Sequence, residues 1–178
     1  MNARHAIVLV GLMGSGKTTV GKRIAQALGY EFADSDDLVA SAAGKSVRDI
    51  FSQDGEAAFR SFESDAIRSV LADRKSPIVL ATGGGAVISS ENRSLISDHA
   101  LHVVWLDASV DDLVVRTKSG VARPLLDGDA SKTLQSLNDE RAAWYEEVAT
   151  LRIDTRGKSV SKVSSAVLES IRAGADHE

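Results

Sequence analysis

The chain has 178 residues, of which 43% are hydrophobic and 26% are charged, and its formal net charge is −4. The length and composition fit one globular domain, residues 1–178. The net negative charge is not typical of a protein that binds nucleic acid. The absence of cysteine excludes disulfides, thiolate catalysis and cysteine-ligated metal sites. No apolar run approaches the ~20 residues of a membrane span, so we expect no membrane partner. The N-terminus enters the first expected strand directly, so we expect no signal peptide and a cytoplasmic location. We also expect a monomer that binds no nucleic acid.

Strands and helices are expected to alternate along the chain. Val20, Ile24 and Leu28 recur every four residues, for example, and Gly29 is well placed to end the helix that they predict. The expected strands lie at residues 6–10, 31–34, 78–81, 101–106 and 151–154. The expected helices lie at about 17–28, 46–53, 56–72, 90–97, 109–117, 131–148 and 159–173. This alternation predicts a parallel sheet covered by helices on both faces, the α/β class.

A phosphate-binding motif connects the first strand to the first helix. Residues 11–18, Gly-Leu-Met-Gly-Ser-Gly-Lys-Thr, match G-x-x-x-x-G-K-[ST], the P-loop pattern whose backbone N–H groups surround phosphate oxygens at a helix N-terminus. Lys17 can reach the β- and γ-phosphates, and the Thr18 hydroxyl can ligate Mg²⁺. The alternative is a glycine-rich turn that binds nothing, but the strand before it and the helix after it favour nucleotide binding. The predicted nucleotide-binding residues are Gly14, Ser15, Gly16, Lys17, Thr18 and Thr19.

Two carboxylates lie at the end of the second expected strand, at the sheet edge where ligands gather in parallel sheets. Asp34 and Asp36 point to the same side if the strand continues through them, and they diverge if it ends at Asp34. One carboxylate could orient Mg²⁺ through water while the other holds a substrate hydroxyl. Alternatively, an aspartate at a strand-to-helix junction could simply cap the helix. The sequence leaves both interpretations open.

A run of glycines, residues 82–85 (Thr-Gly-Gly-Gly), follows the third expected strand. Three successive glycines cost conformational entropy, so a fold accepts them where the backbone must come very close to a ligand or to another backbone segment. Residues 11–18, 34–36 and 82–85 should therefore share one rim of the sheet, although they lie far apart in the sequence.

Three arginines could serve an anionic ligand. Arg60, with Glu63 one turn later, and Arg141 lie on expected helices, where most arginines only solvate the surface. Arg123 lies in an irregular stretch, residues 118–130, bounded by helices. Loops of this length in a compact domain are often lids, and a lid arginine near a transferring phosphoryl group would stabilise charge in the transition state.

Other notable side chains are assigned to packing or to no site. His99 and His102 straddle a helix end and a strand start with no third ligand nearby, so we expect no zinc site there. Trp144 and Tyr145 are expected to pack in the core. The apolar stripe of the last helix is expected to do the same, at Val160, Val163, Val167 and Ile171.

In order and spacing, these motifs resemble those of the shikimate kinase family from residue 6 to about residue 172. The P-loop alone is shared by many enzymes. It becomes highly specific in combination with Asp34-Ser35-Asp36, Phe59-Arg60-x-x-Glu63, Thr82-Gly83-Gly84-Gly85 and Arg123-Pro124-Leu125-Leu126.

The resemblance implies both a fold and an activity. The fold would be a P-loop three-layer α/β fold of the nucleoside-monophosphate-kinase-like type, with a central five-stranded parallel sheet. It would carry a substrate-binding helical region at about residues 36–62 and a lid at about 118–130. The activity would be transfer of the γ-phosphoryl group of ATP to the 3-hydroxyl group of shikimate, giving shikimate 3-phosphate on the route to chorismate and aromatic amino acids.

The resemblance also implies roles for the acceptor-side residues. Asp36 would bind the shikimate hydroxyls and accept the proton. Arg60 and Arg141 would clamp the substrate carboxylate, which suits the bidentate geometry of guanidinium. The backbone of the glycine run would come close to the substrate and the γ-phosphate, at Gly83, Gly84 and Gly85.

On the donor side, the resemblance implies a Mg²⁺ cofactor that Thr18 ligates directly and Asp34 holds through water. Lys17 and the lid residue Arg123 would act on the transferring phosphoryl group. Arg116 resembles the residue that stacks on adenine.

Rival interpretations differ in the acceptor or in the class of protein. A gluconate kinase-like enzyme or a nucleoside monophosphate kinase would share the P-loop, but Asp36 and the two-arginine clamp favour a carboxylated polyol over a nucleotide acceptor. Loss of Lys17, Asp36 or Arg123 would have signalled a silent nucleotide-binding regulatory module, and all three residues are present. A DNA- or RNA-linked NTPase has no basic surface in the sequence to support it.

Overall fold

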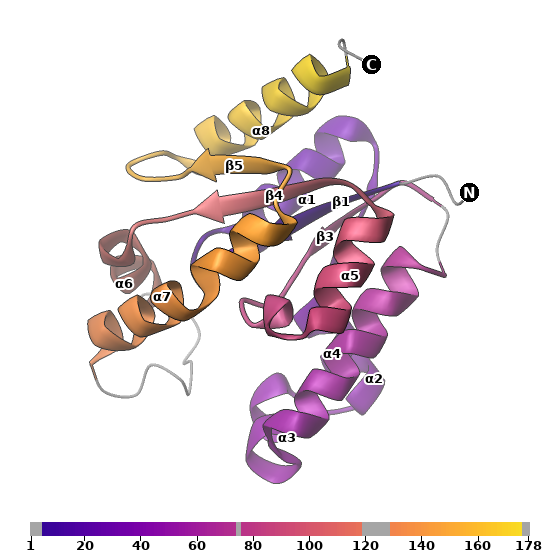
Figure 1. Cartoon of the computed structure of the whole chain (residues 1–178), viewed down its shortest axis with the longest axis vertical. Coiled ribbons are helices and arrows are strands. Elements are labelled where there is room, and N and C mark those ends of the chain that lie inside the picture. Colours follow the sequence, from indigo (N-terminus) through magenta and orange to yellow (C-terminus); the bar gives the residue numbers. More distant parts are fainter. Residues whose placement is uncertain (1–4, 74–75, 119–128, 176–178) are drawn as a thin grey trace.

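Five parallel strands form the sheet at the centre of the computed structural model, which describes residues 5–73, 76–118 and 129–175 (Figure 1). Their order across the sheet is β2-β3-β1-β4-β5, and every neighbouring pair is parallel. The expected α/β class and five-stranded sheet are therefore confirmed. The strands are β1 Ala6–Val10, β2 Glu31–Asp34, β3 Ile78–Ala81, β4 Ala100–Asp107 and β5 Leu151–Asp154.

Helices connect the strands, and each helix expected from the sequence is present. A further helix, α2, was not among the expected segments, although it lies within the helical region expected at 36–62. The helices are α1 Lys17–Leu28, α2 Ser35–Ala43, α3 Val47–Gln53, α4 Gly55–Leu71, α5 Ser90–His99, α6 Val110–Lys118, α7 Ala130–Val148 and α8 Val160–Ala175, with a short 3₁₀ helix η1 at Ala86–Ile88.

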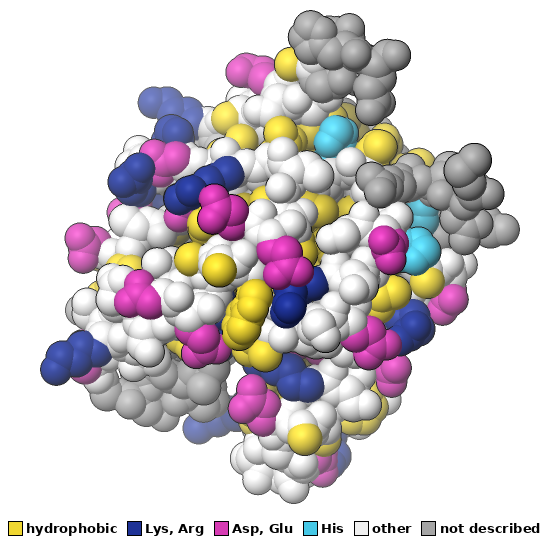
Figure 2. Space-filling view, viewed as in Figure 1, with side chains coloured by type: hydrophobic (Ala, Val, Ile, Leu, Met, Phe, Trp, Pro, Cys, Tyr) yellow, Lys and Arg dark blue, Asp and Glu magenta, His cyan; other side chains and the backbone are white. Residues whose placement is uncertain are grey.

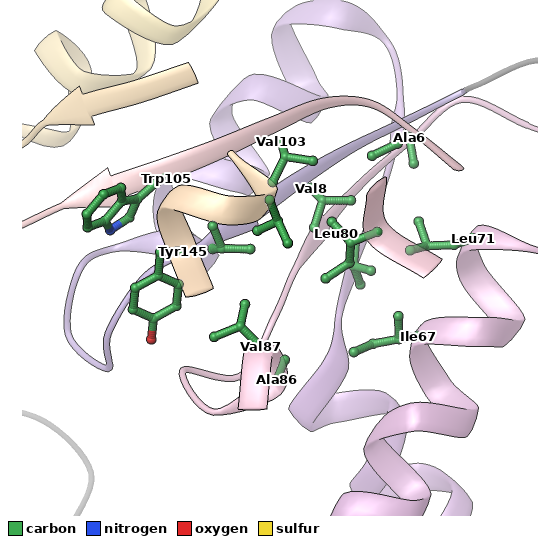
Figure 3. Close-up of a cluster of buried hydrophobic side chains, with 14 of the residues drawn as sticks. Ala6, Val8, Ile67, Leu71, Leu80, Ala86, Val87, Val103, Trp105 and Tyr145 are labelled. Atoms are coloured by element: carbon green, nitrogen blue, oxygen red, sulfur yellow. The ribbon is translucent and has the colours of Figure 1, made fainter. Parts of the chain in front are cut away.

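Alternating side chains of β1, β3 and β4 pack into two cores, one on each face of the sheet, because successive residues of a strand point to opposite sides. Val8 and Val10 belong to a cluster that α4, α5 and α7 cover, and Figure 3 shows part of it. Ile7 and Leu9 belong to a second cluster that α1 and α8 cover. This burial on both faces explains why β1 reads as a continuous apolar run.

A third, smaller cluster holds α2, α3 and α4 together beyond the sheet, at the lower end of Figure 1. Val39 and Ile50 are fully buried there, and the rings of Phe51 and Phe59 lie 4.5 Å apart. These helices form one wall of the pocket described below.

The packing expected from the sequence is confirmed with one exception. Tyr145 is buried and Trp144 is partly buried against the first cluster. Val160 was expected to join the stripe of Val163 and Val167, and this expectation is wrong, because Val160 is 36% exposed. It is the first residue of α8 and lines the pocket described below.

Neither a membrane segment nor a protein-only metal cluster is found among the described residues. No helix in this part of the chain combines the length and apolar character that a membrane span requires. No group of three or more His, Cys, Asp or Glu side chains there could hold a metal ion, and this includes the region of His99 and His102.

Candidate active site

One pocket of about 990 Å³ opens at the carboxyl ends of β1, β2 and β3. The three motifs expected to share a rim of the sheet all line it, together with residues of α4, α6 and α7. Arg123 and most of the lid expected at 118–130 lie outside the described residues. The pocket brings together the other candidate residues: Gly14, Ser15, Gly16, Lys17, Thr18, Thr19, Asp34, Asp36, Arg60, Gly83, Gly84, Gly85, Arg116 and Arg141.

The phosphate-binding loop ends at the N-terminus of α1. Gly16 is the N-cap residue with φ of 95°, a left-handed conformation that favours glycine. The buried Lys17 extends back along the loop, and its Nζ donates hydrogen bonds to the carbonyl oxygens of Gly11 at 2.7 Å and Leu12 at 2.8 Å. No acidic residue lies in the first turn of α1, so its positive end remains available to an anion.

Asp34 serves both as a helix cap and as a partner of the P-loop. Its Oδ1 accepts a hydrogen bond from the Asp36 N–H at 3.0 Å, which caps α2, and its Oδ2 accepts one from the Thr18 hydroxyl at 2.6 Å. The strand therefore ends at Asp34, and the two carboxylates have different neighbours, since Asp34 meets Thr18 and Asp36 lies beside Gly83. Because hydroxyl and carboxylate oxygens are ligands that Mg²⁺ prefers, Thr18 and Asp34 fit this cation.

Two arginines reach the pocket from different helices. Arg60 on α4 donates from Nη1 to Glu63 Oε2 at 2.7 Å and from Nη2 to Glu56 Oε1 at 3.2 Å. Arg141 on α7 is only 6% exposed, and its Nε lies 3.8 Å from Glu140 Oε1, too far for a hydrogen bond. The Nε atoms of Arg60 and Arg141 are buried and find no hydrogen-bond acceptor among the described residues. Buried donors normally have a partner, so these atoms suit an anionic ligand.

Glu63 is a fully buried carboxylate beside the two arginines. Burial raises the pKa of Glu63 above its ordinary value, and the Asp36 carboxylate raises it further, while the Arg60 and Arg141 guanidinium groups oppose the shift. Sequence analysis assigned Glu63 no role in binding. Glu63 entered only as part of the Phe59-Arg60-x-x-Glu63 motif and as an (i, i+3) partner of Arg60, and such an ion pair is usually a surface feature.

The glycines after β3 allow close approach to charged side chains. A Cβ atom at Gly83 would lie 2.6 Å from Glu63 Oε1 and 3.0 Å from Asp36 Oδ1. A Cβ atom at Gly85 would lie 2.6 Å from Arg60 Nη1. A side chain at either position would therefore displace groups that line the pocket.

The middle glycine instead lies against the P-loop. A Cβ atom at Gly84 would approach the Met13 backbone nitrogen to 3.0 Å. The Gly83 N–H donates to the buried Ser35 hydroxyl at 2.8 Å, so this donor is already used within the protein. The glycine run thus meets both ligand-facing groups and another backbone segment, the two alternatives that the sequence left open.

The far end of the pocket is lined by residues after β5 together with Arg116 on α6. Arg116 Nη2 lies 4.0 Å from Asp112 Oδ2. A hydrogen-bonded Arg156 lowers the pKa of the exposed Asp154 to about 2. Sequence analysis gave no individual binding role to several lining residues at this end and on the helical wall, although five of them lie within the substrate-binding helical region expected at 36–62: Lys158, Ser159, Val160, Ser46, Val47, Arg48, Phe51 and Phe59.

Comparisons with known proteins agree over nearly the whole chain. The profile of the family described as shikimate kinase matches residues 13–172. A curated shikimate kinase from Marinomonas sp. (strain MWYL1) is 42% identical over 167 residues, which cover 93% of this chain and 91% of the relative. One from Streptomyces coelicolor is 40% identical over 165 residues, covering 93% and 94%. The solved structure of shikimate kinase from Acinetobacter baumannii in complex with shikimate has a TM-score of 0.90 and 35% identity, covering 97% of this chain and 96% of that chain.

Proposed function

The chain belongs to the shikimate kinase family, and on this premise we propose that it transfers the γ-phosphoryl group of ATP to the 3-hydroxyl group of shikimate, giving shikimate 3-phosphate. One observation carries the choice of acceptor. The guanidinium groups of the partly buried Arg60 and the buried Arg141 lie in the same pocket as Asp36 and the P-loop, and each presents a buried Nε donor without an acceptor among the described residues.

The acceptor side suits a carboxylated polyol. Arg60 and Arg141 can bind a carboxylate in bidentate geometry, and Asp36 can accept hydrogen bonds from ring hydroxyls and take the proton of the attacking hydroxyl. A nucleotide acceptor has no carboxylate for this clamp. Phosphoryl transfer passes through a loose transition state, so fixing the acceptor oxygen in line matters more than a strong base.

The donor side would be bound by the P-loop. Backbone N–H groups and the N-terminus of α1 suit the phosphates, and the Lys17 ammonium is placed to stabilise charge on the transferring phosphoryl oxygens. Thr18 would hold Mg²⁺ directly and Asp34 through water, and the cation supplies further charge neutralisation when bound. Arg116 lines the end of the pocket proposed for adenine.

Three further expectations stay predictions. Arg123 is expected to stabilise the transferring phosphoryl group, but it lies outside the described residues. The monomeric state can be measured by sedimentation equilibrium. The cytoplasmic location suits an enzyme that draws on cellular ATP, and fractionation of the native host would test it.

The first experiment is ADP release from MgATP with shikimate, quinate, gluconate, AMP or no acceptor. We expect release with shikimate alone among these, and NMR of the product should show the phosphoryl group on the 3-oxygen. Release only with another acceptor would overturn the substrate. No acceptor-dependent release, despite ATP binding, would overturn the proposal as a whole.

Variants at two lysines of α1 test whether that activity belongs to this site. Lys17→Met should abolish ADP release while the protein remains folded. Lys22→Met removes an exposed lysine from the same helix and should leave the rate unchanged. Equal activity of the two variants would contradict the role of Lys17.

A further inference from the structure

A tyrosine on α7 connects the core of the molecule to the glycine run. The Tyr145 hydroxyl donates a hydrogen bond of 2.5 Å to the Gly84 carbonyl oxygen, across 61 residues of sequence. The Tyr145 ring is 1% exposed and its centroid lies 5.8 Å from that of Trp105. Figure 3 shows the hydroxyl pointing away from Trp105, so the ring is anchored in the core while its polar end reaches the pocket wall.

The bond fixes the direction of the donor on the next residue. The Gly84 carbonyl and the Gly85 N–H belong to one peptide group, and no peptide bond among the described residues is cis. In a trans peptide the C=O and N–H point in opposite directions. Because Tyr145 holds the carbonyl toward α7, the Gly85 N–H must point away from α7.

The backbone donors of Gly84 and Gly85 have no acceptor within the described part of the chain. Gly83 differs, because its N–H is bound to Ser35. Gly85 is a buried residue directly beside the Arg60 guanidinium group. A buried backbone N–H without a protein partner is uncommon and suits a ligand.

We propose that Tyr145 is a positioning residue, which orients the Gly84–Gly85 peptide so that the Gly85 N–H binds the acceptor beside Arg60. This inference rests on the proposed function. The same helix carries Arg141 one turn before Tyr145, so the hydroxyl also fixes the spacing between that arginine and the glycine run. Burial raises the pKa of Tyr145, which keeps the hydroxyl protonated as a donor.

The test is Tyr145→Phe, which keeps the ring in the core and removes the hydroxyl. Loss of the hydrogen bond to Gly84, together with the contact of the hydroxyl with Arg141, should raise the KM for shikimate roughly 3- to 10-fold. We expect the KM for ATP to change less than about 2-fold, because the P-loop keeps its own hydrogen bonds. The other tyrosine of the chain provides a matched control, since Tyr30→Phe lies in the opposite core and should change neither KM.

Calorimetric titration of shikimate separates positioning from folding, because the stoichiometry reports the folded fraction and the Kd reports the site. Full stoichiometry with a weaker Kd supports the proposal. Reduced stoichiometry with an unchanged Kd, or a rise in the KM for ATP alone, overturns it. If wild-type protein shows no shikimate-dependent ADP release, the proposed function fails. If wild-type protein is active and Tyr145→Phe matches it, only the role of Tyr145 fails.

Discussion

Gly85→Ala should weaken acceptor binding through a single displaced side chain. The residue has φ of −98°, which alanine adopts without strain, so the backbone tolerates the change. The added Cβ atom would lie 2.6 Å from Arg60 Nη1, whereas ordinary contact begins at 3.4 Å. Arg60 is the flexible partner and must move, and this movement also disturbs its 2.7 Å bond to the fully buried Glu63.

The size of the effect follows from what Arg60 is proposed to do. A hydrogen bond to a charged group contributes about 1.5–3 kcal/mol, which corresponds to roughly 10- to 100-fold in binding. We expect the KM for shikimate to rise by that factor in steady-state ADP release. The KM for ATP should stay within about 2-fold of the wild-type value, because Arg60 is hydrogen-bonded to Glu63 and Glu56 on the acceptor side of the pocket and not to the described residues of the P-loop.

Two further variants make the reasoning refutable. Gly44→Ala meets no atom within 4 Å but has φ of 63°, so it should lower stability by about 1–2 kcal/mol and leave both KM values unchanged. In an Arg60→Ala background, adding Gly85→Ala should cost little more, because the group it displaces is gone. If the increases in the KM for shikimate from the two substitutions were additive in the double variant, Gly85→Ala would not act by displacing Arg60.

Three other predictions concern charge at the site. Burial raises the pKa of Glu63 above 4.5, so the folded chain binds this proton more tightly than the unfolded chain, and the corresponding stability is lost as pH rises through the folded pKa. In the Glu63→Gln variant, the free energy of unfolding, measured by urea denaturation, should therefore decrease less steeply with pH above 4.5 than in the wild-type protein. The same pH dependence in both proteins would contradict this. Asp34→Asn preserves the cap of α2 but should raise the Mg²⁺ concentration for half-maximal rate by roughly 10- to 100-fold, and an unchanged Mg²⁺ titration would exclude Asp34 from the metal site. Arg156→Gln should move the pKa of Asp154 from about 2 toward 3.8 in a carboxylate NMR titration. A pKa that stays near 2 in the variant would show that a group other than Arg156 lowers it.

The elements that the sequence predicted well are those with a local cause. Residues 78–81 form a strand buried on both faces, and that environment favours a continuous apolar run. The helix at Lys17–Leu28 ends at Gly29, whose left-handed conformation closes the last turn. The P-loop was predictable because its glycines, lysine and threonine all act within eight consecutive residues.

The second helix was missed because its packing signal is weak. Within Ser35–Ala43 only Ser35 and Val39 are buried, so no apolar stripe stands out. The available signals were its caps, Asp34 at one end and Gly44 at the other. Sequence analysis considered the Asp34 cap only as an alternative to ligand binding, whereas the two oxygens of this carboxylate cap α2 and meet Thr18 at once.

The burial of the charged side chains Arg141 and Glu63 was not predicted from the sequence. The helical pattern alone favoured a surface role for Arg141 over a ligand-binding one, yet Arg141 is buried in line with Leu134, Tyr145 and Val148 on one stripe of α7. The position of this arginine within the apolar stripe of the helix could have indicated that it is buried. The burial of Glu63 had no comparable signal, because its neighbours come from segments that only the fold brings together.

The glycine run joins the donor and acceptor halves of the site because it is fixed from three sides. The Thr82 hydroxyl donates to the Leu9 carbonyl of β1 at 2.9 Å, Gly83 is bound to Ser35 at the start of α2, and Gly84 is bound to Tyr145 on α7. Each of these anchors belongs to an element that carries another part of the site: β1 leads into the P-loop, α2 begins beside Asp34 and Asp36, and α7 carries Arg141. Since in-line phosphoryl transfer depends on the distance between two bound substrates, a rigid connection between their binding elements is what the chemistry requires. Only glycine fits at these positions without displacing the site, because a side chain at Gly83 would displace Glu63 or Asp36 and a side chain at Gly85 would displace Arg60.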